Sequence, residues 1–83
     1  MEKLLIHLYV PALAREYDLF VPQDVTIRKV TNVIESGIQE LSSGRYTPSG
    51  KALLTVQGGK QPLDPEQTMM MYGLHDGEDL VLI

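Results

Sequence analysis

Apolar and polar residues alternate along the first quarter of the chain, and this pattern predicts two β-strands. Over residues 3–10 every second residue from Leu4 onward is apolar, and Pro11 ends the run because proline cannot donate to a strand ladder. A second alternation covers residues 16–21 and is closed by Pro22. Its apolar side is formed by Tyr17, Leu19 and Val21. The connection between the two segments is short, so we expect a hairpin.

Apolar residues then recur at spacings of three and four, which predicts an amphipathic helix from Thr26 to about Leu41. The expected buried stripe consists of Ile27, Val30, Ile34, Ile38 and Leu41. The expected opposite side consists of Arg28, Lys29, Asn32, Glu35 and Gln39. The Thr26 hydroxyl can accept from the free N–H groups of the first turn, so Thr26 is the predicted N-cap.

The second half of the chain is divided by glycine and proline. We expect a mobile loop over residues 42–50, a strand over 51–57, a turn at Gly58-Gly59, a short edge piece at 61–63, one or two helical turns over 64–72 ended by Gly73, and a last strand over 79–83. The last strand is apolar almost throughout, which favours a place in the middle of a sheet. One helix between two groups of strands predicts an α+β fold, with the helix across one face of a mixed sheet.

Composition limits the class of protein. Eighty-three residues suit one domain, here residues 1–83, and the net charge of −4 argues against a nucleic-acid partner. The absence of cysteine excludes disulfides and cysteine zinc sites. No apolar run approaches the roughly 18 residues that a membrane span needs. We therefore expect a cytoplasmic protein without direct membrane insertion.

Three stretches carry a resemblance to a known superfamily. Residues 26–30 (TIRKV), 57–64 (QGGKQPLD) and 68–80 (TMMMYGLHDGEDL) occur in the order and spacing seen in ubiquitin. The chain thus resembles the ubiquitin-like β-grasp superfamily, and its ending looks most like the YukD/EsaB group of bacterial proteins associated with type VII (WXG100) secretion. The resemblance implies a β-grasp roll with a mixed four- to five-stranded sheet and one long helix. It also implies an accessory, non-enzymatic adaptor or regulatory module.

The alternative that the superfamily offers is a sulfur carrier or protein modifier used by an activating enzyme. Such relatives end in a flexible Gly-Gly tail, because the activating enzyme admits only an unbranched backbone. Here residues 80–83 read Leu-Val-Leu-Ile, and Gly58-Gly59 lies inside the expected fold. We therefore expect a protein that is not conjugated.

The predicted protein-binding site is the sheet face turned away from the helix. It is expected to consist of Leu5, His7, Tyr9, Phe20, Leu53 and Val81, with Ile83 as a further candidate. Exposed apolar patches on small proteins are often functional. The partner would be a protein, with a membrane component of a secretion system as the first candidate. Two alternatives stay open: these residues only cover the sheet, or they form a homodimer contact.

Other chemistry finds little support in the sequence. His7 and His75 lie far apart without the four ligands that zinc needs, and the acidic group at residues 76–79 lacks calcium-loop spacing. Gly58-Gly59-Lys60 lacks the Ser or Thr and the long helix of a phosphate loop. We predict no catalytic residue, no metal site and no cofactor.

Overall fold

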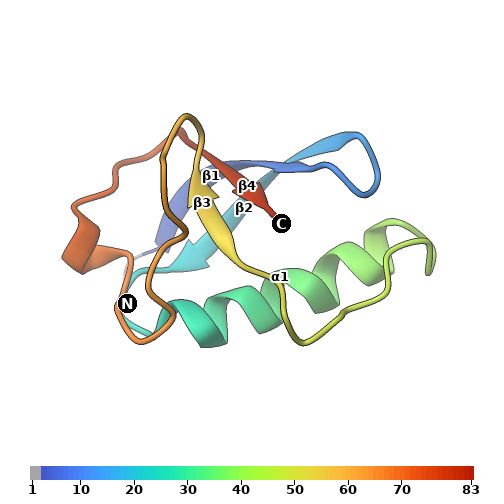
Figure 1. Ribbon diagram of the computed structural model, residues 1–83, viewed down its shortest axis with the longest axis horizontal. Coiled ribbons are helices and arrows are strands. Elements are labelled where there is room, and N and C mark those ends of the chain that lie inside the picture. Colours follow the sequence, from blue (N-terminus) through green and yellow to red (C-terminus); the bar gives the residue numbers. More distant parts are fainter. Residues whose placement is uncertain (1–2) are drawn as a thin grey trace.

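One long helix crosses one face of a four-stranded sheet (Figure 1). The computed structural model describes residues 3–83. Its elements are β1 (Lys3–Val10), β2 (Arg15–Pro22), α1 (Ile27–Leu41), β3 (Leu54–Val56), the 3₁₀ turn η1 (Met70–Tyr72) and β4 (Glu78–Leu82). This arrangement confirms the predicted α+β class, with four strands. That residues 1–83 form one domain stays a prediction, and its first two residues lie outside the described range.

The strand order is β2-β1-β4-β3. β1 pairs antiparallel with β2 and parallel with β4, and β4 pairs antiparallel with β3. The apolar last strand therefore lies inside the sheet, as its composition predicted. A parallel pair needs a long crossover, and residues 11–77 supply it, with α1 packed on the sheet between its ends.

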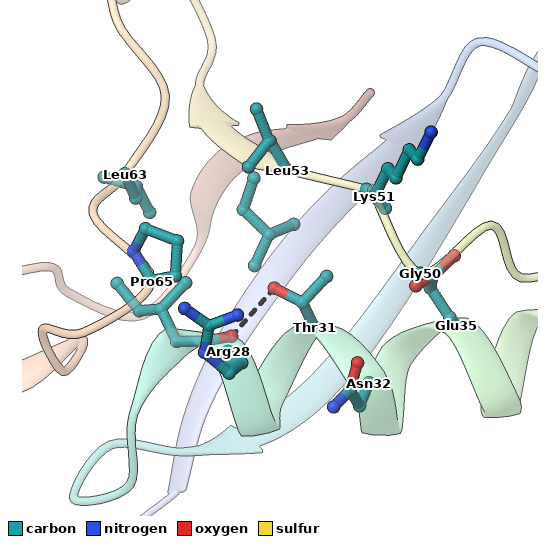
Figure 2. A pocket seen from close by; sticks show the side chains of 12 residues that line it. Arg28, Thr31, Asn32, Glu35, Gly50, Lys51, Leu53, Leu63 and Pro65 are labelled. Atoms are coloured by element: carbon teal, nitrogen blue, oxygen red, sulfur yellow. Dashed lines mark hydrogen bonds between the residues drawn. The ribbon is translucent and has the colours of Figure 1, made fainter.

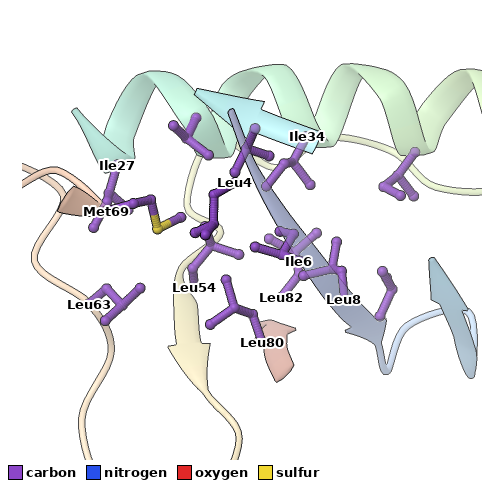
Figure 3. Close-up of a cluster of buried hydrophobic side chains, with 14 residues drawn as sticks. Leu4, Ile6, Leu8, Ile27, Ile34, Leu54, Leu63, Met69, Leu80 and Leu82 are labelled. Carbon is purple, nitrogen blue, oxygen red and sulfur yellow. The ribbon is translucent and has the colours of Figure 1, made fainter. Parts of the chain in front are cut away.

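The core lies between α1 and the sheet (Figure 3). Alternate residues of β1 point into it, because side chains of a strand alternate between faces. Fully buried side chains come from β1, α1, β3, β4 and the segment before η1: Ile6, Leu8, Val30, Ile38, Leu54, Met69 and Leu80. Of the three consecutive methionines, Met69 is completely buried while Met70 and Met71 are exposed, so this run contributes one side chain to the core.

The ends of α1 follow the sequence signals. Thr26 is the N-cap, and its hydroxyl accepts from the Lys29 N–H at 3.4 Å. The helix ends at Leu41, and Ser43 and Gly44 then take positive φ values. Gly73 ends η1 with φ 66°, as expected for a glycine that stops a helical turn.

Two predictions about the faces of α1 are wrong. Glu35, expected on the solvent side, is only 3% exposed, because the following loop folds over this flank of the helix and bonds to its carboxylate. Leu41, expected in the buried stripe, is 61% exposed. It is the last helical residue and borders an open cavity of about 210 Å³ beside the β1–β2 turn.

Two strand predictions are longer than what the structure shows. The third strand is Leu54–Val56 rather than residues 51–57, although backbone hydrogen bonds link Leu53 with Ile83 in both directions. Residues 61–63 form no strand, since they make only one backbone–backbone bond, from the Leu63 N–H to the Leu54 carbonyl, beside a bond that the Gln61 carbonyl accepts from the Thr55 hydroxyl. Residues 64–72 contain one helical turn, η1, which agrees with the one or two turns predicted there. Within the described residues, no helix has the length and apolarity to cross a membrane.

Candidate functional site

The six residues predicted as a binding site all lie on the sheet face turned away from α1. In β1 the buried residues are Leu4, Ile6, Leu8 and Val10, so the alternate residues must point outward. Residues directly opposite each other in a sheet share a face. The register pairs Leu5 with Phe20 and Tyr9 with Val81, and the two Leu53–Ile83 backbone bonds place that pair one step further along β3 and β4.

These residues do not form one continuous apolar patch. Leu5 and Phe20 make one apolar area, where Phe20 is 67% exposed. Tyr9, Val81 and the Leu53–Ile83 pair make a second area. A polar row separates the two, because His7 lies opposite Asp18 on β2 and opposite Asp79 on β4. We call the whole surface the sheet face and this middle part the polar row.

His7 is the centre of the polar row and uses both ring nitrogens. Its Nδ1 lies 2.7 Å from Asp18 Oδ1, and its Nε2 lies 2.6 Å from Glu16 Oε1. Two carboxylate partners require both nitrogens to carry protons, which only the imidazolium does. The hydrogen bond to Asp18, and next the one to Glu16, raise the pKa of His7 to about 9.

The polar row is therefore acidic overall. One imidazolium offsets one of three carboxylates, those of Glu16, Asp18 and Asp79. The charges are exposed to solvent, so salt screens their mutual attraction. A surface with two apolar areas around an acidic centre suits a protein partner that brings apolar side chains and a hydrogen-bond donor between them.

The period-two alternation contains the signal for the acidic residues. Placing Tyr17, Leu19 and Val21 on the core side already puts Glu16 and Asp18 beside Phe20 on the outer side. The sequence does not identify the cross-strand partner of His7, because the pairing register depends on the geometry of the β1–β2 turn. There Ala14 takes φ 52°, a conformation that its sequence does not signal.

The described residues show few features of a metal site or a catalytic site. Among residues 3–83, no group of three or more His, Asp or Glu side chains could hold a metal ion. His75 pairs with Glu78 across 2.9 Å rather than with His7. The expectations of no metal, no cofactor and no catalysis stay predictions.

Comparison with protein families gives one match, which covers nearly the whole chain. The family described as "WXG100 protein secretion system (Wss), protein YukD" matches residues 5–82. No curated protein matches the sequence significantly.

Solved structures share the fold at low sequence identity. The ubiquitin-like domain of the Mycobacterium tuberculosis type VII secretion system protein ECCD1 has a TM-score of 0.76 and 20% identity, with 100% of this chain and 99% of that chain covered. The UBL domain of Plasmodium falciparum Dsk2 has a TM-score of 0.74 and 15% identity, covering 98% and 96%. Caldiarchaeum subterraneum ubiquitin has a TM-score of 0.67 and 19% identity, covering 99% and 92%. The ubiquitin-like fold is thereby confirmed.

Proposed function

Since this chain belongs to the YukD family of the WXG100 protein secretion system, we propose that it is a non-conjugated adaptor or regulatory module that binds a protein of that system through the sheet face. The exposed apolar side chains of the sheet face carry the proposal. Phe20 and Tyr9 belong to strands whose other face packs against the core. Large aromatic side chains at such positions are typical of the centres of protein interfaces.

The proposed partner is a membrane component of the secretion apparatus, reached from the cytoplasm. Two observations support this partner: the family belongs to a secretion system, and a ubiquitin-like domain of similar fold occurs in a type VII secretion protein. The Gly58-Gly59 pair supports the non-conjugated role, because it lies in a turn inside the fold, where the Gly59 N–H donates to the Val56 carbonyl oxygen at 2.7 Å. A homodimer through the same face is the competing outcome.

A pull-down from native cell lysate tests the proposal. The bait is the wild-type chain, compared with a His7→Ala/Phe20→Ala double variant and with Met71→Ala as the matched control. Met71 is 72% exposed and is part of η1, outside the four strands of the sheet. We expect secretion components to elute natively from the wild type and from Met71→Ala and to be lost from the double variant.

Two results would contradict the proposal. Adducts that survive denaturing elution would show that the chain is conjugated. Equal recovery by the double variant, with circular dichroism showing it folded, would place the binding site elsewhere. Light scattering of the purified chain identifies a homodimer separately.

A further inference from the structure

A groove of about 240 Å³ runs between α1 and the segment leading into β3 (Figure 2). Its walls include Arg28 and Thr31 from the helix and Ala52 and Leu53 from the other side. It is distinct from the sheet face, although Leu53 belongs to both surfaces. The groove is therefore a second place where this small chain could receive a ligand.

Glu35 brings a nearly buried carboxylate to one end of this groove. Its Oε2 accepts from the Tyr46 hydroxyl at 2.7 Å and from the Ser49 N–H at 3.2 Å. Within residues 3–83, the second oxygen, Oε1, accepts no hydrogen bond. No fully buried side-chain oxygen in this range lacks a partner, so Oε1 must reach the surface, and the surface that Glu35 borders is the groove.

The Glu35 carboxylate also lacks a cation. Among residues 3–83, no Lys, Arg or His nitrogen lies within 4.0 Å of it. Arg28 is engaged by Glu66, with Nε 3.0 Å from Oε1 of that residue. Lys51 also lines the groove, but within residues 3–83 it forms no ion pair, and in Figure 2 its ammonium lies away from Glu35. Burying an unpaired charge is unfavourable, so charges at such positions are usually paired.

We propose that this groove binds a lysine or arginine side chain of a protein partner. The ammonium or guanidinium group donates to Glu35 Oε1, and the aliphatic stem lies against Ala52 and Leu53. The two neutral donors on Oε2 hold the carboxylate in place before the cation arrives, which reduces the ordering cost of binding. The claim does not depend on the sheet face, so either site can fail without the other.

The test uses two small probes and amide chemical shifts measured by NMR. N-acetyl-lysine methylamide presents the cationic side chain, and N-acetyl-norleucine methylamide presents an apolar chain without the ammonium. We expect the lysine probe to give saturable shifts at Ser49, Gly50 and Ala52 in the wild type, and the norleucine probe to bind about tenfold more weakly or not at all, since charge-assisted bonds are the stronger ones.

Two variants complete the test. Glu35→Gln removes the charge but keeps an oxygen for Tyr46, and we expect it to bind the lysine probe about tenfold more weakly. Glu40→Gln, on the exposed side of the same helix, should bind like the wild type. The proposal is overturned if the wild type shows no saturable shift, or if the two probes bind equally. Equal binding by a folded Glu35→Gln overturns it as well, and the comparison of probes on the wild type does not depend on that variant folding.

Discussion

Removing the Tyr46 hydroxyl measures how strongly the loop over residues 42–50 is tied to α1. Tyr46→Phe deletes the donor that lies 2.7 Å from Glu35 Oε2 and leaves only the Ser49 N–H on that oxygen. A hydrogen bond to a charged group contributes about 1.5–3 kcal/mol. Because this bond is only partly buried, we take the lower end, about 1.5 kcal/mol.

Urea unfolding gives the free energy directly, and thermal unfolding gives a second reading. For a domain of this size, a loss of 1 kcal/mol lowers Tm by about 4–8 °C, so we expect a decrease of about 6–12 °C. Tyr9→Phe is the matched control, because the Tyr9 hydroxyl makes no hydrogen bond within residues 3–83 and exposed substitutions of this kind change stability by less than about 0.5 kcal/mol.

A double-mutant cycle with Glu35→Gln assigns the loss to this pair. If the bond carries the effect, Tyr46→Phe should cost clearly less in the Glu35→Gln background, where a neutral amide replaces the carboxylate. A loss below about 0.5 kcal/mol for Tyr46→Phe in the wild type would refute the reasoning. The same cost in both backgrounds would refute it too, because the hydroxyl would then act through some other contact.

Three further predictions concern the polar row, the core and one turn. The pKa of His7 in the folded chain lies above the ordinary 6.5, so its protonated form stabilises the fold fully below pH 6.5, and this contribution is lost as pH rises toward 9. NMR titration of the ring should give a midpoint near 9 in the wild type and a lower midpoint in Asp18→Asn. An unchanged midpoint in that variant would show that Asp18 does not raise the pKa. Met69→Ala should cost about 2–5 kcal/mol in urea unfolding, whereas Met71→Ala should cost less than about 0.5 kcal/mol; similar losses would mean that Met69 is not a core residue. Gly59→Ala should destabilise the turn that follows β3, since its Cβ would lie 2.8 Å from the Val56 carbonyl oxygen, and a variant with wild-type Tm would show that the turn relaxes freely.

The fold was predictable because its signals are local and repeated. The period of two in β1 and the spacing of three and four in α1 each predict one buried face, and together they predict a helix packed on a sheet. Leu80 and Leu82 add the last strand, whose apolar character predicted its interior place. The predicted lengths of some elements were wrong. β3 has only three residues. Where a strand ends depends on the hydrogen-bonding groups of the neighbouring strand rather than on the sequence of the segment itself.

The two candidate sites depend on contacts between residues far apart in the chain, and this limits what sequence can predict about them. The outward alternation of β1 and β2 is a local property, so the membership of the sheet face was predictable. Its division into two apolar areas was not, because it depends on His7 lying opposite Asp18 and Asp79 in the pairing register. Glu35 is the stronger case, since the helical spacing was interpreted as placing it on the solvent side, and only the return of Tyr46 and Ser49 over that flank buries it. A charged residue that the fold buries without a cation is thus visible only in three dimensions, and for that reason the groove beside Glu35, rather than the more apparent apolar face, yields the sharper binding hypothesis.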